Sequence, residues 1–157
     1  MKRAGIFIII YNTDRFLSKQ LMLINEYCTD DKYVIYVINN SPVSAVEVND
    51  RIEYQANRAG AIYLKTIPDA KHNDPSRSHA GACNFIYKEI GKDFDYCLVL
   101  DHDIFPIRPF AIKEKLGSCM MAGVEEIRLN SEKKIQYLWL GLLFVNNAVI
   151  SEKDKAL

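Results

Sequence analysis

The sequence predicts an α/β domain of three layers, in which helices cover both faces of a mostly parallel central sheet. Apolar runs at residues 6–11, 33–38 and 96–100 have the composition of strands buried on both faces. Segments with helical periodicity separate these runs, and strands that alternate with helices are typical of a parallel sheet. Two further strand-like segments near the end of the chain flank a polar turn, which predicts a C-terminal hairpin.

The first strand, residues 6–11, is followed by Asn12-Thr13-Asp14, whose polar side chains can cap a helix that runs to about residue 28. The apolar residues of this helix recur at helical spacing and form one stripe that can pack on a sheet. They are Leu17, Leu21, Ile24 and Cys28. The second strand, residues 33–38, ends in the polar segment 39–42, so two strands carry polar loops at their carboxyl ends.

The middle of the chain predicts a second helix and a short third strand. The helix covers residues 43–56, and Gly60 is placed to end it. Residues 61–64 can form the strand that follows. Residues 65–78 contain two prolines and many polar side chains, a composition too irregular for a helix or a strand.

A third helix is predicted over residues 79–90, with Ser78 as its cap and Gly91 as its stop. Four of its residues share one face at helical spacing. They are His79, Cys83, Ile86 and Ile90. This helix would lead into the strand at residues 96–100.

That strand ends in two carboxylates, Asp101 and Asp103. Because they are two positions apart where the chain leaves the strand, both can reach a single hard cation through oxygen ligands. Pro106 and Pro109 disfavour a long helix immediately afterwards. The acidic pair is therefore expected on a loop at the carboxyl end of a strand, where open α/β sheets bind ligands.

The last strands are predicted at residues 119–128 and 135–145, around a turn at residues 130–133. The tail from Ser151 is charged and is expected to fray. At 157 residues, with 49% of them hydrophobic, the chain suits one domain with a real core, either minimal or truncated. The polar ends of the first, second and fourth strands should gather on one edge of the sheet and form one cleft.

Charge and cysteine usage exclude several classes of protein. Twenty basic residues balance twenty acidic ones, so no overall field attracts nucleic acid, and an anionic ligand must be held by a local site. The four cysteines form no Cys-x-x-Cys pair, which predicts neither a zinc site nor a disulfide framework and favours a cytoplasmic location. The apolar start of the chain lacks a cleavage site, and no apolar run approaches the roughly 20 residues of a membrane span.

These segments resemble the nucleotide-sugar glycosyltransferases with the GT-A fold, a Rossmann-like α/β/α arrangement, and especially the family 2-like group. The resemblance covers most of the chain. The matching segments are Tyr11-Asn12, Asn39-Asn40-Ser41, the helix start from Ser78 to Asn84, Asp101-His102-Asp103 and Trp139-Leu140-Gly141.

The resemblance implies transfer of a sugar from a nucleoside-diphosphate sugar, such as a UDP-sugar, to a glycan, lipid or protein acceptor. It implies that Asp103 coordinates Mn²⁺ or Mg²⁺ bridging the diphosphate, and that Asp101 faces the ribose or shares the metal. The ends of the first two strands would cradle the base and the ribose, and the tryptophan segment would line the acceptor side. The residues concerned are Tyr11, Asn12, Asn39 and Asn40 on the nucleotide side, and Trp139 and Gly141 on the acceptor side.

Two features depart from the family pattern. Asn39 and Asn40 stand where family members usually carry an Asp that accepts from the base, and an amide both donates and accepts. GT-A catalytic domains are also commonly longer, and the acidic base of inverting members is not evident. Glu125 or Glu126 could be that base by position, since only one of two adjacent residues on a strand faces inward.

Several single residues have a structural interpretation beside the functional one. Arg77 and His79 could meet the diphosphate at a helix start, although an arginine in a polar loop is commonly only solvated. His102 could contact the nucleotide or simply face solvent. Tyr11 could stack on a base or lie at the core edge, and Trp139 could be a sugar platform or pack under the hairpin.

Two other functions fit parts of the sequence. A catalytically incomplete sugar-nucleotide binding module that needs another domain would explain the short chain. A haloacid-dehalogenase-like phosphatase also has an Asp-x-Asp motif after an apolar strand. That motif normally lies on the first strand and continues with Thr or Val where Phe105 stands here.

Overall fold

The computed structural model describes residues 3–66, 75–130 and 133–150. These residues form a six-stranded sheet in the order β3-β2-β1-β4-β6-β5. Its strands are β1 (Ala4–Ile10), β2 (Tyr33–Asn39), β3 (Ile62–Lys65), β4 (Tyr96–Asp101), β5 (Met121–Asn130) and β6 (Lys133–Asn146). The helices are α1 (Leu17–Tyr27), α2 (Val46–Arg58), α3 (Pro75–Phe85) and α4 (Ile112–Leu116).

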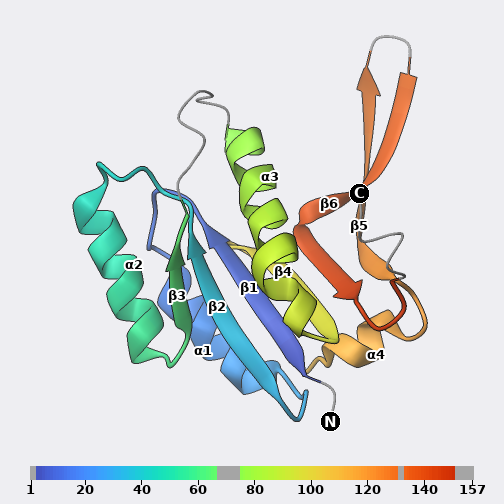
Figure 1. The fold of residues 1–157 in the computed structure, drawn as a ribbon, viewed down its shortest axis with the longest axis horizontal. Helices are drawn as coiled ribbons and strands as arrows, with labels where there is room; N and C mark the ends of the chain where they lie inside the picture. The colour runs from blue at the N-terminus through green and yellow to red at the C-terminus, as the bar shows by residue number, and fades with distance from the viewer. Residues whose placement is uncertain (1–2, 67–74, 131–132, 151–157) are drawn as a thin grey trace.

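The sheet is parallel from β3 to β4 and antiparallel beyond it (Figure 1). β1 lies between β2 and β4, with Ile6 opposite both Ile35 and Leu98. β6 runs antiparallel to β4, and β5 pairs with β6 as a hairpin whose far half stands clear of the helices in Figure 1. The predicted mostly parallel sheet with a C-terminal hairpin is confirmed.

The apolar residues of β1 alternate between two cores, and all seven residues of this strand are buried. Ile6, Ile8 and Ile10 pack in one core with residues of α1, α2 and α4. Phe7 and Ile9 pack in the other with residues of α3. Figure 1 accordingly shows α3 in front of the sheet and α1 behind it. The three predicted layers follow from this alternation, because each face of a strand buried on both sides needs its own helical cover.

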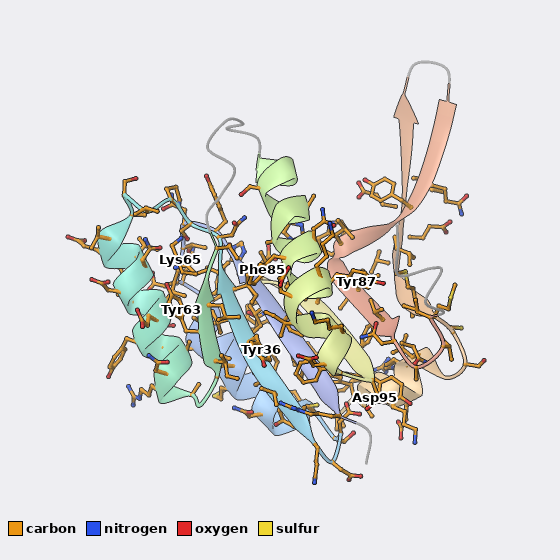
Figure 2. All side chains as sticks on the ribbon, viewed as in Figure 1. Tyr36, Tyr63, Lys65, Phe85, Tyr87 and Asp95 are labelled. Carbon is orange, nitrogen blue, oxygen red and sulfur yellow. The ribbon has the colours of Figure 1, made fainter. Side chains whose placement is uncertain are left out.

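Aromatic rings fill the core on the α3 side. The ring of Phe7 stacks on Tyr36 at a centroid distance of 5.3 Å, and Phe94 meets Phe7 edge-on at 5.7 Å (Tyr36 is labelled in Figure 2). Offset and edge-to-face arrangements of this kind are the favoured ones for aromatic pairs.

α1 begins later than the polar triplet 12–14 predicts. Its first residue is Leu17, and no side chain caps it. Asn12 instead has a left-handed backbone with φ of 51°, and Asp14 forms an ion pair with Arg51 of α2 at 3.0 Å. The three residues therefore form the turn that follows β1, and Asp14 pairs with α2 instead of capping α1.

α2 ends as Gly60 predicts. The N–H of Gly60 donates to the carbonyl of Asn57 and that of Ala61 to the carbonyl of Ala56, while Gly60 has φ of 73°. This pair of bonds is the Schellman ending, which requires a left-handed residue at that position.

α3 begins at Pro75, earlier than predicted, so Ser78 is not its cap. Ser78 lies buried inside the helix and accepts a hydrogen bond from Asn40. Proline is well suited to the first turn of a helix, where its missing N–H would have had no partner. The helical path continues through a π-helical turn, Ile86–Ile90, and a 3₁₀ turn, Gly91–Asp93, before β4.

The five residues of α4 were not predicted as a helix. The carboxylate of Asp30, far away in sequence, accepts a hydrogen bond of 2.7 Å from the first backbone N–H of α4, that of Ile112. A cap supplied from a distant segment leaves no local sequence pattern. The predicted fraying of the tail from Ser151 and the tip of the hairpin turn lie outside the described residues.

All four cysteines lie in the described part of the chain and are free thiols. Cys97 is buried, and burial raises the pKa of its thiol to about 12. Among the helices described, none combines the length and the apolar character that crossing a bilayer requires.

Candidate active site

A cavity of about 540 Å³ opens at the carboxyl ends of the parallel strands. The sheet side contributes Ile9, Tyr11, Asn40, Asp101 and His102. The other walls are His79 of α3 and the hairpin residues Glu126, Tyr137, Trp139, Leu140 and Gly141. The predicted gathering of three strand ends at one cleft is confirmed, because parallel strands bring their carboxyl ends to the same edge.

Asp101, the last residue of β4, forms an ion pair inside this cavity. Its Oδ1 lies 2.7 Å from Nε2 of His79, although the N–H of the ring is not aligned for a regular hydrogen bond. Burial by itself lowers the pKa of His79, but the contacts with Asp101 and with the Sγ of Cys83 outweigh it and raise the pKa to about 10. The raised pKa favours the imidazolium form of His79, whose positive charge lies beside Asp101.

The other oxygen of Asp101 faces Gly141 of β6. A methyl group at Gly141 would lie 2.6 Å from Oδ2 of Asp101 and 2.3 Å from the indole of Trp139. Both distances are shorter than atoms tolerate, so glycine is what allows carboxylate and indole to approach the same point. Trp139 lines the cavity, and its indole packs against the backbone of Gly141.

Gln20 holds the loop that carries the acidic residues, and it was not among the predicted site residues. Its side chain is fully buried, and its Nε2 donates to the carbonyl of Asp101 at 2.8 Å and to that of Ile104 at 2.7 Å. The N–H of Ile104 also donates to the carbonyl of Asp101, which closes the turn around His102 and Asp103. A glutamine within the apolar stripe of α1 is the sequence signal that could have indicated this role.

His102 lines the cavity, whereas the exposed side chain of Asp103 lies outside it. The two acidic residues of the motif therefore differ in position, with only Asp101 at the cavity wall. No group of three or more metal-ligating side chains occurs among the described residues.

Asn39 has its polar groups engaged within the protein. Its Nδ2 donates to Asn49 at 2.8 Å and to the hydroxyl of Tyr63 at 3.0 Å, and its Oδ1 accepts from the N–H of Ser41. The side chain is fully buried and does not line the cavity. The base-binding role predicted for Asn39 stays a prediction, and this burial argues against it.

Asn40 lines the cavity but also ties three segments together. Its Nδ2 donates to Ser78 of α3, and its Oδ1 accepts from Thr66 at 2.8 Å. Lys65, labelled in Figure 2 near Tyr63, donates to the backbone carbonyls of Asn39, Ser41 and Thr66. The ends of β2 and β3 and the start of α3 are thus fixed around the cavity.

Of the first-strand residues, Tyr11 lines the cavity and is 42% exposed, so its ring is accessible to a ligand. Asn12 does not line the cavity, and its backbone N–H donates to the hydroxyl of Ser41 at 2.7 Å. Arg77 lies in the first turns of α3, and its side chain is outside the described part of the structure.

The two adjacent glutamates of β5 differ in position, as their alternation on a strand predicts. Glu125 is exposed and lies away from the cavity, whereas Glu126 lines it. Glu126 is opposite Tyr137 in the hairpin, and the Tyr137 hydroxyl donates to its Oε2 at 2.7 Å. Tyr137, Trp139, Leu140 and Gly141 of β6 all line the cavity, next to the irregularity in the β5–β6 pairing between Gly123 and Glu125.

Solved structures that match this chain include the two that follow. The match to the apo structure of the bifunctional glycosyltransferase WbbM has a TM-score of 0.57 and 15% sequence identity, and it covers 98% of this chain. The chain therefore shares its fold with a glycosyltransferase. It spans only about a third of that protein, since the match covers 33% of the WbbM chain.

The second similar structure is that of S. aureus TarS, with a TM-score of 0.43 and 14% identity over 67% of this chain and 17% of that one. No protein-family model matches the sequence, and no curated protein matches it either.

Proposed function

We propose that this chain is the nucleotide-sugar-binding domain of a GT-A glycosyltransferase, which transfers a sugar from a nucleoside-diphosphate sugar, such as a UDP-sugar, to an acceptor. One observation carries the proposal. Asp101, at the carboxyl end of the fourth strand in the chain, shares one cavity with the end of β1 and with an aromatic wall on β6. Carboxylate, cation and aromatic rings in one cleft suit a ligand that has both phosphates and a sugar.

The residues present fit a divalent cation such as Mn²⁺ or Mg²⁺. Asp101 and Asp103 supply carboxylate oxygens on one turn, and such ions prefer oxygen ligands and take others from water and substrate phosphates. Asp101, whose Oδ1 is paired with His79, and the exposed Asp103 would be the residues that hold the ion. When bound, it would supply positive charge to the diphosphate that leaves.

The chain's own residues would orient the donor and keep it in place. The imidazolium of His79 lies in the cavity wall, where it can attract the diphosphate by a charge-assisted hydrogen bond. Tyr11 offers an exposed ring for a base, and Trp139 offers one for a sugar. Gln20 fixes the backbone of the turn that carries both carboxylates.

A binding module that needs a second domain is the alternative. The two functions differ in turnover. Binding of UDP-sugars without release of UDP would identify the module, and release of UDP in the presence of an acceptor would identify the enzyme.

The test is the binding of UDP to the intact chain by calorimetry, with Mn²⁺ and with EDTA. We expect affinity to fall at least about tenfold without metal, and Asp103→Ala to lose the metal-dependent part while the circular dichroism spectrum is unchanged. Asp93→Ala, an exposed carboxylate before β4, is the matched control and should bind like the wild type. Unaltered Mn²⁺-dependent affinity in Asp103→Ala would contradict the metal assignment.

A further inference from the structure

A second cavity lies at the other end of β4, and we propose that it binds the phosphate group of a small phosphate monoester. This cavity measures about 220 Å³ and is lined by Tyr87, Lys88, Lys92 and Asn147. None of these four residues lines the cavity of the candidate active site. Because the two cavities share no residue, the inference does not depend on the proposed function.

The second cavity, called the lysine pocket below, lies at the amino end of the parallel strands. Its residues come from the two turns that precede β4 and from the position that follows β6. β4 runs from Tyr96 to Asp101, and at about 3.3 Å per residue the two ends are about 17 Å apart. A small ligand in the lysine pocket is therefore too far from Asp101 to contact it.

The lining of the lysine pocket is positively charged. Lys88 and Lys92 are exposed, and neither forms an ion pair with another described residue. The carboxylates next to them in the sequence, Glu89 and Asp93, do not line the pocket. Two ammonium groups match a phosphate monoester, which carries a charge of about −1.5 to −2 at neutral pH. Their N–H groups and the hydroxyl of Tyr87 can all donate hydrogen bonds to phosphate oxygens.

The backbone under the two lysines is irregular. Ile86–Ile90 is a π-helical turn that carries Lys88, and Gly91–Asp93 is a 3₁₀ turn that carries Lys92. The helical path is therefore first wider and then tighter than an α-helix. Turns of the π type are rare, and they frequently lie at functional sites. The lysine pocket lies where this change of pitch occurs.

Asn147 forms the wall of the lysine pocket on the strand side. Its backbone N–H donates to the carbonyl of Asp95 at 2.9 Å. Its Nδ2 donates to the carbonyl of Gly91 at 2.8 Å and to that of Phe94 at 2.9 Å. These bonds fix Asn147 against the turn that carries Lys92.

The size and the polarity of the lysine pocket favour a small anionic group. Cavities for drug-sized ligands have about 300–1,000 Å³, and a volume of about 220 Å³ is below that range. Three of the four lining side chains are charged or amide groups, which disfavours an apolar ligand. A phosphate monoester can be free in solution, as in glycerol 3-phosphate, or part of a lipid headgroup, as in phosphatidic acid. Both sources present the same group to the pocket.

The first test is an NMR titration of the intact chain with glycerol 3-phosphate. It is carried out without metal, at neutral pH and at constant ionic strength, with the ligand replacing chloride. We expect saturable shifts in the backbone amides of residues 86–94 and 147–148, which form and adjoin the lysine pocket. The absence of saturable shifts in these amides up to about 20 mM ligand would overturn the inference, whether or not other amides shift.

The second test removes the two positive charges. The double variant Lys88→Gln with Lys92→Gln should bind glycerol 3-phosphate at least about tenfold more weakly, because two charge-assisted hydrogen bonds are lost. The matched control is Lys113→Gln with Lys115→Gln, which removes two exposed lysines of α4 that do not line the pocket. Its affinity should stay within about twofold of the wild type. Equal affinities in the two double variants, both with the circular dichroism spectrum of the wild type, would overturn the inference.

Vesicles identify the source of the phosphate group. Cosedimentation compares phosphatidylcholine vesicles that contain phosphatidic acid with vesicles of phosphatidylcholine alone. Binding that requires phosphatidic acid and is lost only in the Lys88 and Lys92 double variant would assign the lipid headgroup to the lysine pocket. Saturable NMR shifts without such binding, or with vesicle binding that is equal in the two double variants, would assign the soluble ester.

Discussion

At the scale of single residues, the environment of each site side chain depends on the residues that contact it. One carboxylate oxygen of Asp101 is paired with the ring of His79. The other lies near the backbone of Gly141, which has no side chain. The glycine matters because of the side chain it lacks, since any larger residue would occupy the space shared by Asp101 and Trp139. The geometry of the cavity wall therefore depends on a residue without a functional group.

Gly141→Ala should impair the site more than the fold. The new methyl group would displace the Trp139 indole or the Asp101 carboxylate, and we expect UDP affinity with Mn²⁺ to fall about tenfold or more in calorimetry. The matched control is Gly81→Ala on α3, where a methyl group meets no atom within 4 Å. Equal UDP affinity in the two variants would show that the close approach at Gly141 is not needed for binding.

At the scale of elements, distant segments fix the loops around the cavity. α1 holds the acidic turn through Gln20, and Asn40 of the loop after β2 holds the start of α3 through Ser78. The residues that follow α1 likewise hold α4 in place through hydrogen bonds. There the Thr29 N–H donates to the carbonyl of Phe110, and Asp30 caps the helix. Loops without regular structure gain their order from these long-range bonds.

Asp30→Ala should destabilise the protein by about 1 kcal/mol, the usual cost of losing a helix cap. The reason is that the first N–H of α4 would lose its partner at the carboxylate. Urea denaturation measures the change, and Asp31→Ala, an exposed neighbour, is the control that should leave the free energy of unfolding within about 0.5 kcal/mol. A free energy of unfolding unchanged in Asp30→Ala would exclude the capping role.

At the scale of the molecule, one sheet joins a rigid parallel part to an antiparallel hairpin. β1 is covered on both faces and flanked on both edges, while β5 is the edge strand and is partly exposed. The cavity lies where the two parts meet, with Tyr11, Asn40 and Asp101 at the ends of the parallel strands and Glu126, Tyr137 and Trp139 on the hairpin.

Hydrogen exchange should separate the two parts. The amides of β1 should exchange slowest, at the rate of global unfolding, and those of β5 should exchange at least about 100-fold faster, because an edge strand can open locally. Exchange followed by mass spectrometry measures both. Equal protection of β1 and β5 would mean that the hairpin opens only with the whole domain.

Several parts of this architecture could be read from the chain itself. The buried runs of β1, β2 and β4 and the Gly60 ending of α2 follow from local patterns. The position of the Asp101 motif after an apolar run predicted that it lies at the carboxyl end of a strand. The pattern of the adjacent glutamates also predicted that one of them faces inward. Local periodicity carries this information, because the alternation of side chains on a strand or helix is fixed by backbone geometry.

Only the tertiary structure decided which residues meet. It placed Glu126 and not Glu125 on the cavity, buried Asn39 among internal partners, and paired His79 with Asp101. It also gave Gln20 and Asp30 their partners, more than 80 residues away in the sequence. The sequence determines which segments become strands and helices, since that depends on neighbours along the chain. Contacts between segments depend on how the layers pack, which no local pattern records.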